Sequence, residues 1–465
     1  MGQNRGLSKP SVRAVRRFFV ILLWIVVWQL ASMVIGTDLL LAGPISTFTA
    51  LVRDVVESAF LSTVGFTLTR VMSGFILAFI LALVLGILST SFSAVYEFIA
   101  PVLSAMKSVP VACIVVLLLI WIGSRNVSFV AVVFVALPAL YFSVTEACSA
   151  RDTSFDALLK TLRVSRIRRW LATTWPDLVP FLIASGKTCV GMSWKAGVAA
   201  ELIGIPQGSM GDRVYQAKLL FDTADLFAWT IVVVLLAWAS ERLFLWLLGS
   251  SRTWALNAAC LSRPGGDSQK VSKAAEIALH EVTVSYGDLV VGPFEIDADA
   301  GSRMVFTDPS GAGKTTAFRI LLGFESAYDG EVLRPKSPSC MFQTTKLVED
   351  MSAEANLVLA CDGLLSYSDA QALLLELLLP ASALDRPVSE LSGGMRRRVE
   401  LARALAVSSD AVLLDEPFSS LDDLTRKKAC EFVLRHLQGR TLLVASHDEG
   451  IAALLKAYED RVLAS

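Results

Sequence analysis

The chain has 465 residues, of which 54% are hydrophobic and 18% are charged, and its mean hydropathy is +0.58. Soluble domains carry about 25% charged residues, so this composition excludes an ordinary soluble protein. The net charge of −1 gives no basic excess for binding nucleic acid, and we expect no nucleic-acid partner. The seven cysteines form no C-x-x-C pair and the three histidines do not cluster, which predicts neither a metal site nor a disulfide framework.

The N-terminus is basic. Five basic residues precede the first apolar stretch, with no acidic residue among them: Arg5, Lys9, Arg13, Arg16 and Arg17. Because positively charged segments stay on the cytoplasmic side of a membrane, residues 1–17 are predicted to be cytoplasmic. The apolar stretch 18–36 is longer than the core of a signal peptide and has no clear cleavage site, so we interpret it as a membrane span.

Residues 18–249 are predicted to form an all-α membrane bundle of six transmembrane helices. About 20 apolar residues let a helix cross a bilayer, and the chain offers six such stretches: 18–36, 64–88, 98–122, 127–144, 178–200 and 226–248. Lys107 and Pro110 interrupt the third. Residues 38–62 and 203–225 are expected on the outer side, the latter with a short helix near 215–221. Six spans return the C-terminus to the cytoplasm.

Residues 151–177, between the fourth and fifth predicted spans, are polar and rich in basic residues. The topology and the positive charge both predict a cytoplasmic location. Residues 154–162 are expected to form a short helix. Two interpretations stay open: a basic loop that touches anionic lipid, or a coupling helix that docks on a cytoplasmic domain.

A strand, a glycine-containing loop and a helix follow one another in the second half, at residues 303–306, 307–316 and 317–322. This is the arrangement of a phosphate-binding loop, in which backbone N–H groups close on phosphate oxygens. Lys314 is predicted to contact the β and γ phosphates, and the Thr315 hydroxyl to hold Mg²⁺. The other residues predicted to bind nucleotide here are Ser310, Gly311, Ala312, Gly313 and Thr316.

Polar residues follow two further strand-like runs. Residues 411–414 are predicted to be a buried parallel strand, and Asp415 and Glu416 follow it. Asp415 is a candidate Mg²⁺ ligand, and Glu416 is a candidate general base that polarises the attacking water. His447 follows the second run, 441–445.

Together these motifs resemble the ATPase subunit of ABC transporters, from about residue 275 to the C-terminus. They stand in the family's order: A-loop (Tyr286), Walker A (307–316), Q-loop (Gln343), signature (391–395), Walker B (411–416), D-loop (Asp422) and H-loop (His447). The resemblance implies an α/β P-loop domain that binds ATP and Mg²⁺ and hydrolyses ATP. It implies that Lys314, Glu416 and His447 are catalytic and that Gln343 also contacts Mg²⁺. It further implies that Ser392, Gly393 and Gly394 act in trans, on the nucleotide of a partner chain.

Two residues depart from the family pattern. Asp308 replaces the first Walker A glycine and brings an acidic side chain near a polyanion, which is expected to weaken nucleotide binding. Met395 replaces the usual glutamine of the signature, with little expected effect because Ser392, Gly393 and Gly394 supply the donors. Lys314, Asp415, Glu416 and His447 are all present, so we expect hydrolysis.

The membrane half resembles, over residues 63–248, the permeases of the nitrate, sulfonate and taurine importer group. Its matching segments are 67–75, 107–110, 121–123, 163–165, 175–180 and 193–201. The resemblance implies that the cytoplasmic loop docks on the ATPase domain through Leu158, Leu162 and Arg163. Such permeases usually carry E-A-A-x-x-x-G there, and this chain has ALLKTLR at 157–163, without the glutamate or the glycine.

Three ionisable residues lie in or at the end of the fifth predicted span: Lys187, Lys195 and Glu201. Such residues are costly in a membrane and are usually functional. Lys195 and Glu201 are therefore candidates for a translocation path, and a Lys195–Glu201 pair that only fixes helix packing is equally open. Lys187 is close enough to the cytoplasmic side to snorkel.

We divide the chain into a cytoplasmic N-terminus (1–17), a permease domain (18–249) with coupling segment 151–177, a linker (250–274) and an ATPase domain (275–465). One membrane half and one ATPase half make half a transporter, so the resemblance implies a homodimer, with a different half-transporter as the alternative partner. Its expected place is the cytoplasmic (inner) membrane, among lipid, with an extracytoplasmic substrate-binding protein.

The predicted function is ATP-driven import of a small anion or organic solute. A homodimeric exporter and a non-transport mechanical or signalling ATPase are the alternatives. The cytoplasmic connections, 89–96 and 151–177, are short for an exporter.

Overall fold

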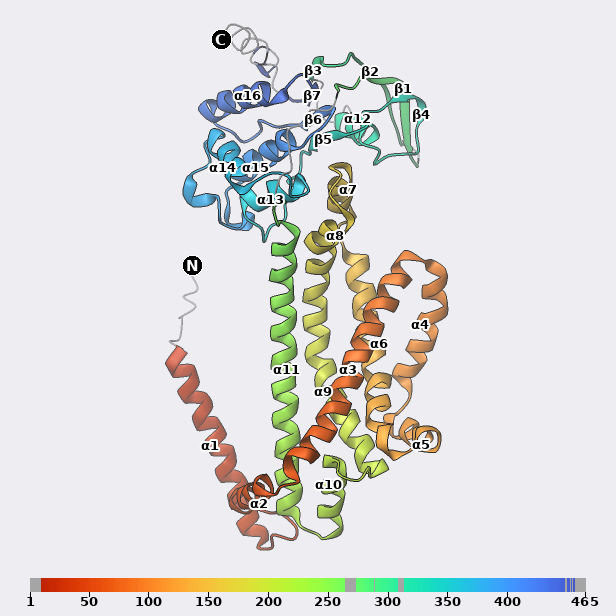
Figure 1. The fold of residues 1–465 in the computed structure, drawn as a ribbon, viewed down its shortest axis with the longest axis vertical. Coiled ribbons are helices and arrows are strands. Elements are labelled where there is room, and N and C mark those ends of the chain that lie inside the picture. Colours follow the sequence, from red (N-terminus) through yellow and green to blue (C-terminus); the bar gives the residue numbers. More distant parts are fainter. Residues whose placement is uncertain are drawn as a thin grey trace. The chain divides into compact units, whose positions relative to one another are not determined.

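The computed structural model describes residues 10–263, 273–287, 289–307, 313–447, 450, 451, 453 and 455, and leaves out the side chains of 10–14. The chain forms two compact units: Met1–Ala150 with Leu178–Ser250, and Arg151–Asp177 with Ser251–Ser465. Segment 151–177, which interrupts the helical unit in sequence, therefore clusters with the C-terminal unit (Figure 1).

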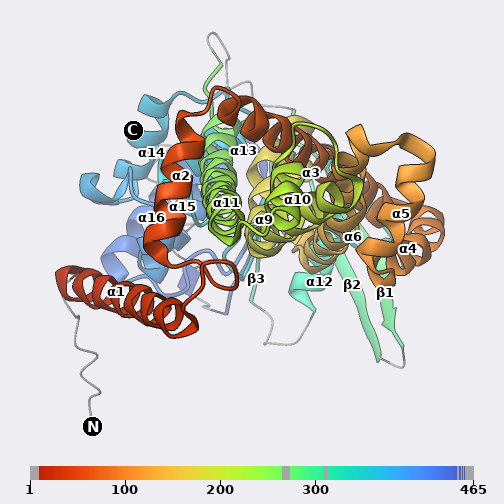
Figure 2. The same cartoon turned by 90° about the horizontal axis from the view of Figure 1, so that it is seen from below.

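The first unit is helical. Its elements are α1 (Pro10–Ile35), α2 (Pro44–Val56), α3 (Phe60–Ser91), α4 (Ser93–Ser108), α5 (Val111–Ile122), a 3₁₀ turn (Ser124–Asn126), α6 (Val127–Ala150), most of α9 (Trp175–Gly204), α10 (Met210–Leu219) and α11 (Thr223–Ala259) up to Ser250. Helix α1 lies at the edge of this unit (Figure 2). The Trp28 indole near its end donates to the Ala42 carbonyl at 3.0 Å, and its ring lies 5.4 Å from that of Phe227.

Small residues let α3 and α6 approach closely. Gly74, Ala78, Ala82 and Gly86 recur every fourth residue on one face of α3, and all four are buried. A Cβ added at Gly74 would lie 2.6 Å from the Phe129 carbonyl oxygen, and one at Gly86 would lie 2.6 Å from Cγ1 of Val144. Van der Waals packing drives helix association in lipid, so this small-residue face explains why these helices pair.

Among the described residues, four helices are long and apolar enough to cross a membrane: Val15–Ile35, Phe60–Ser91, Ser124–Ala150 and Thr223–Ala259. Helices α4 and α5 add a fifth if the bent pair is one span. Helix α9 covers the predicted fifth span and is 30 residues long. It is not among these apolar helices, and it carries Lys187, Lys195 and Glu201. The prediction of helices was therefore confirmed, whereas the number of spans by this measure is four or five rather than six.

Three predicted elements differ in the structure. The third span is not one continuous helix, because α4 and α5 are bent by 106° at the break before Pro110. A residue before proline disfavours the helical conformation, and Val109 is extended, with ψ 130°. The outer connection 38–62 contains helix α2. The short helix expected near 215–221 is α10, which begins earlier because the Ser209 hydroxyl caps it by accepting from the Asp212 N–H.

The second unit combines two sheets with helices. An antiparallel sheet has the order β2 (Leu289–Ala298), β1 (Ile277–Tyr286), β4 (Asp329–Leu333). A parallel sheet has the order β3 (Arg303–Phe306), β7 (Thr441–Ala445), β6 (Ala411–Asp415), β5 (Pro338–Met341). Every residue of β5, β6 and β7 is buried, as expected for apolar strands covered on both faces. The strands predicted at 303–306 and 441–445 have these bounds, and that predicted at 411–414 extends to Asp415.

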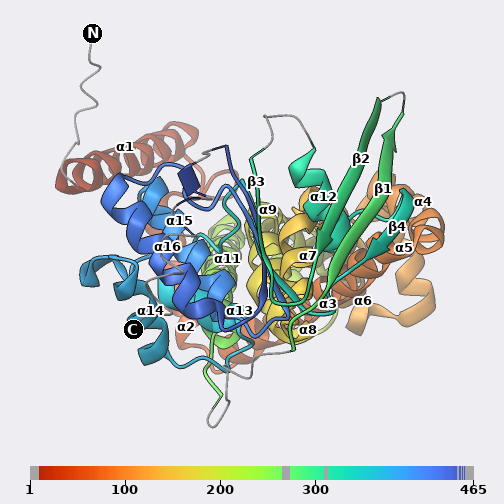
Figure 3. The same ribbon diagram turned by 90° about the horizontal axis from the view of Figure 1, so that it is seen from above.

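Helices surround the parallel sheet. They are α7 (Thr153–Thr161), α8 (Arg166–Arg169), a π-helical turn (Trp170–Thr174), α12 (Lys314–Leu321), α13 (Ala353–Ala360), α14 (Tyr367–Glu376), α15 (Gly393–Ala406) and α16 (Asp423–Leu437), with 3₁₀ turns at Ala381–Ala383 and Val388–Glu390. Figure 3 shows β1, β2 and β4 on one side of this unit and α13 to α16 on the other. Residues 250–259, predicted as linker, continue helix α11.

Candidate functional site

The predicted motifs converge because three strands of the sheet are parallel and in register. Phe306, the last residue of β3, and Asp415, the last of β6, both pair with Ala445, the last of β7. Segments that follow the carboxyl ends of neighbouring parallel strands meet at one edge of a sheet. The phosphate-binding loop follows β3, Glu416 follows β6 and His447 follows β7, so all three reach this edge.

The start of α12 contacts the other two strand ends. The Thr315 hydroxyl donates to Oδ2 of Asp415 at 2.8 Å, and Nζ of Lys314 lies 3.3 Å from Nδ1 of His447. Gly313 precedes the helix at φ +82°, where a Cβ would come within 2.7 Å of the Phe294 ring, so the position requires glycine. Thr316 lies in the first turn of α12. The remaining predicted loop residues lie outside the described residues: Asp308, Ser310, Gly311 and Ala312.

Glu416 has a strained backbone. Its φ is +52°, a left-handed conformation that costs a non-glycine residue about 1–3 kcal/mol. Oε1 of Glu416 lies 3.4 Å from Nε2 of His447, and the side chain is 12% exposed. The backbone N–H donates to the Ala445 carbonyl at 2.8 Å, which fixes Glu416 against β7. A carboxylate beside an imidazole, at the edge where the phosphate-binding loop ends, is suited to activating water.

Gln343 and Tyr286 lie near this edge. Gln343 follows β5, is exposed, and lines a cavity of about 830 Å³ together with Thr315 and Phe342. Tyr286 ends β1, and its hydroxyl donates to Oε2 of Glu325 at 3.0 Å. Desolvation raises the pKa of this phenol, and so does the hydrogen bond to the Glu325 carboxylate.

The signature and D-loop residues begin helices. Ser392 is the N-cap of α15, and its hydroxyl accepts from the Met395 N–H at 3.4 Å. Ser392 and Gly393 are exposed, and a Cβ added to Gly394 would lie 3.3 Å from the Ser420 carbonyl. The start of this 14-residue helix therefore presents small residues and backbone N–H groups at the surface. Asp422 caps α16 in the same way, by accepting from the Thr425 N–H at 3.2 Å.

The predicted coupling residues are packed into the C-terminal unit. Leu158 and Leu162 are buried in the same hydrophobic core as the parallel strands. A guanidinium nitrogen of Arg163 donates to the Lys336 carbonyl at 3.0 Å. Arg163 has φ +61°, the conformation that a glycine adopts easily, although the glycine of the family pattern is missing at this position.

Sequence reasoning missed several residues that fix this segment. Nζ of Lys346 donates to Oδ2 of Asp152 and to the Ser154 hydroxyl, both at 2.7 Å, at the start of α7. Arg168 donates to the Ala259 and Leu261 carbonyls, at 3.0 and 2.6 Å. No motif marks these residues, because their partners are distant in the sequence.

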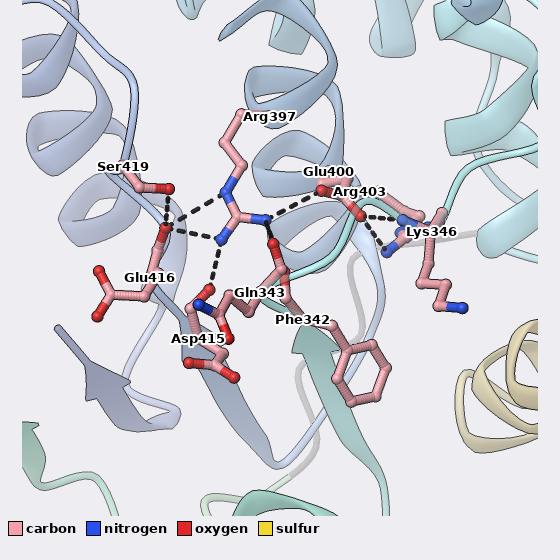
Figure 4. A network of polar contacts seen from close by, with 9 residues as sticks. All are labelled: Phe342, Gln343, Lys346, Arg397, Glu400, Arg403, Asp415, Glu416 and Ser419. Atoms are coloured by element: carbon pink, nitrogen blue, oxygen red, sulfur yellow. Dashed lines mark hydrogen bonds and ion pairs between the residues drawn. The ribbon is translucent and has the colours of Figure 1, made fainter. Parts of the chain in front are cut away.

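Sequence reasoning also missed Arg397, in the basic run that follows the signature. This buried guanidinium contacts backbone carbonyls of both the Q-loop and the end of β6 (Figure 4). The run of three arginines was visible in the sequence, but nothing there distinguished the buried one from its neighbours.

The suggested Lys195–Glu201 pair is wrong. Lys195 is exposed in the helical unit, whereas Glu201 is fully buried. Oε2 of Glu201 accepts from the Thr67 hydroxyl at 2.8 Å and from the Gly211 N–H at 3.3 Å. Both residues lie on α9, but they project from different faces of that helix.

Comparisons with known proteins agree with both halves of the chain. Residues 74–249 match the family described as "Binding-protein-dependent transport system inner membrane component", and residues 291–419 match the family "ABC transporter". An aliphatic sulfonates import ATP-binding protein of Streptomyces avermitilis is 36% identical over 193 residues, which cover 41% of this chain and 73% of that protein. A thiamine import ATP-binding protein of Yersinia pseudotuberculosis is 34% identical over 194 residues, which cover 38% of this chain and 82% of that protein.

The fold and the comparisons define a membrane-embedded nucleotide-binding protein with a helical permease-type unit and an α/β ATPase unit. The chain belongs to the ABC transporter family. It binds ATP, and its hydrolysis of ATP is coupled to transport of the binding-protein-dependent, import type.

Proposed function

We propose that two copies of this chain form an importer in the cytoplasmic membrane, with the ATPase unit and the N-terminus on the cytoplasmic side. A substrate-binding protein on the outer side delivers the solute, a small organic anion of the sulfonate type. The observation that carries the proposal is the union, in one chain, of a binding-protein-dependent permease match with the Thr315–Asp415 and Glu416–His447 geometry. The sulfonate class is supported by the import ATPase of Streptomyces avermitilis.

The site residues divide the work of hydrolysis. Glu416 is the general base that takes a proton from the attacking water, and His447 orients its carboxylate from 3.4 Å. Lys314 brings a positive charge to the terminal phosphates of ATP, and the N–H groups around Gly313 bind phosphate oxygens. Ser392, Gly393 and Gly394 of one chain face the nucleotide of the other, so each of the two ATP sites is shared between protomers.

The residues present fit a magnesium ion. The Thr315 hydroxyl and the Asp415 carboxylate supply oxygen ligands 2.8 Å apart, and the exposed amide of Gln343 lies in the same cavity as Thr315. No group of three or more His, Cys, Asp or Glu in the described part of the chain forms a metal site by itself. Mg²⁺ typically takes one or two protein ligands and completes its shell with phosphate and water, so it would bind together with ATP. Bound there, it would neutralise charge on the phosphates.

The test is ATP hydrolysis by the full chain in nanodiscs, with and without the binding protein encoded nearest to it. Ethanesulfonate, taurine and thiamine are added in turn, and Glu416→Gln serves as the blank. Stimulation by the binding protein with ethanesulfonate or taurine is the expected result. Stimulation with thiamine alone would overturn the sulfonate class. Hydrolysis indifferent to the binding protein would overturn import.

A further inference from the structure

A buried cluster of three charged side chains lies on α15, behind the candidate hydrolytic site. Arg397, Glu400 and Arg403 are 5%, 0% and 1% exposed. Oε2 of Glu400 lies 3.3 Å from Nη1 of Arg397, and Oε1 lies 3.7 Å from Nη2 of Arg403. Burying charges is expensive, and replacing such a group with apolar residues is often neutral or stabilising. Stability alone therefore does not explain the cluster.

Arg397 contacts two motifs that lie far apart in the sequence. Its Nη1 donates to the carbonyls of Phe342 and Gln343, at 2.6 and 3.1 Å. Its Nη2 donates to the carbonyls of Asp415 and Glu416, at 2.5 and 2.7 Å. Figure 4 shows the guanidinium between the Q-loop and the end of β6. One rigid, planar group thus fixes the distance between the backbones of Gln343 and Glu416.

These bonds act where the backbone is strained. Because Glu416 is left-handed, its carbonyl points toward α15 and accepts from Arg397 and from the Ser419 N–H and hydroxyl. Several donors on one carbonyl offset the cost of this conformation. The conformation in turn sets the direction of the Glu416 carboxylate toward His447.

Glu400 extends the connection to the coupling segment. Its Oε1 accepts from the Lys346 N–H at 2.6 Å, and Arg403 donates to the Lys346 carbonyl. The side chain of the same lysine holds Asp152 and Ser154 at the start of α7. Lys346 therefore contacts α7 through its ammonium and the charged cluster through its backbone.

We propose that Arg397 and Glu400 are positioning residues that hold Glu416 in its hydrolytic geometry and link that geometry to the docking of α7 through Lys346. The inference rests on the proposed role of Glu416 in ATP hydrolysis. A movement of α7 shifts the backbone at Lys346. Because Glu400 and Arg397 are buried together with their partners, both side chains follow this shift. The carbonyl of Glu416 then moves with the Arg397 guanidinium.

The first experiment compares Arg397→Gln with Arg435→Gln in the full chain in nanodiscs. Arg435, on α16, is the control, because its guanidinium is 62% exposed, pairs with Glu376 and contacts neither motif. We expect Arg397→Gln to lower kcat by about 10- to 100-fold, as misplaced catalytic groups do. Affinity for a non-hydrolysable ATP analogue should change less than about 3-fold, since Arg397 contacts the backbone and not the nucleotide.

Arg435→Gln should keep kcat within about 2-fold even where it lowers Tm, because loss of an exposed arginine away from the site affects at most stability. Equal kcat values for Arg397→Gln and the parent, or equal losses in the two variants, would overturn the positioning role. An inactive parent would overturn the proposed hydrolysis instead, which separates the two failures. Arg397→Lys keeps the charge but cannot reach both motifs, and we expect only partial recovery.

The second experiment tests the link to α7 with a double-mutant cycle. Lys346→Met removes the ammonium and keeps the backbone N–H that Glu400 accepts. Glu400→Gln has one acceptor oxygen in place of two, so it cannot serve both Lys346 and Arg397. Lys346→Met should lower kcat about 3- to 10-fold in the parent and have almost no further effect in Glu400→Gln. Additive losses, or no loss from Lys346→Met, would overturn the link.

Discussion

Glu416 combines a reactive side chain with a left-handed backbone conformation, and only the role of the side chain could be predicted from the sequence. An acidic residue directly after a buried strand and an aspartate predicts a general base. Its left-handed φ of +52°, and the Arg397 guanidinium that contacts its carbonyl, depend on residues nineteen positions away along the chain. The backbone of Arg163 could not be predicted from the sequence either. Its φ is +61°, a conformation that favours glycine, although the glycine of the family pattern is replaced by arginine here.

Glu416→Gln tests the role of the side chain. The amide has the shape of the carboxylate but no basicity, so we expect ATP hydrolysis to fall by at least about 100-fold while ATP still binds. Hydrolysis and retention of labelled ATP by the purified full chain check this. Glu349→Gln, at an exposed position away from the strand ends, is the control. Fast turnover by Glu416→Gln would remove Glu416 as the base.

Asp308→Gly tests the departure in the Walker A motif. Asp308 lies five positions before Gly313 in the phosphate-binding loop. Its negative charge is expected to repel ATP, which is a polyanion. Removing a like charge near an exposed site gains about 1 kcal/mol, or roughly a fivefold lower dissociation constant for ATP. Titration with ATP at low ionic strength measures it, and the gain should shrink as salt is added. An unchanged affinity would mean that the carboxylate points away from the phosphates.

At the scale of elements, glycine spacing fixes how α3 packs against α6. Gly86→Val places a branched side chain 2.6 Å from Cγ1 of Val144, and overpacking of this kind costs about 1–3 kcal/mol. We expect a lower melting temperature for the detergent-purified protein. Gly65→Val is the matched control, because a Cβ at Gly65, on the same helix, meets nothing within 4 Å. Equal melting temperatures for the two variants would contradict this account of the packing.

The start of α7 provides a prediction about pH. The Lys346 ammonium, with the Ser154 hydroxyl, lowers the pKa of Asp152 to about 2. A lowered carboxyl pKa stabilises docking above the unfolded value near 4, and the contribution is lost only as pH falls toward 2. Asp152→Asn keeps the helix cap but loses the ion pair, so we expect a loss in ATPase rate of up to about 5-fold. Rates measured at several values between pH 6 and pH 8 should show the same loss, and a loss that varies over this range would contradict the assignment.

At the scale of the whole molecule, the proposed homodimer with shared ATP sites predicts complementation between two inactive chains. Lys314→Ala and Ser392→Ala each damage both sites of a homodimer. In a mixed dimer the two defects fall on one site and leave the other intact, so about half of the parent's activity should return. Differently tagged chains are co-expressed and purified through both tags, and their ATPase rate is compared with that of each homodimer. A mixed dimer as inactive as its parents would show that the site is not shared in this way.

The sequence by itself determined β3, β6 and β7 of the ATPase unit, the helix after its phosphate-binding loop, the identity of its chemical groups and the apolar stretches of the permease. These depend on local pattern: runs of buried residues, capping residues, and motifs whose parts lie within about ten positions. The tertiary structure alone decided the 106° bend between α4 and α5, the burial of Glu201 without Lys195, and the choice between the two interpretations of 151–177, which packs in the C-terminal unit.

The charged cluster on α15 shows why. Three consecutive arginines lie on α15: Arg396, Arg397 and Arg398. The helical turn buries only Arg397, whose guanidinium contacts carbonyls of two loops. Its backbone partners lie 18 to 55 positions away and accept through carbonyl groups, which every residue possesses. Backbone contacts leave no mark on side-chain identity, so no motif records them, and only the folded arrangement of β5, β6 and α15 brings them together.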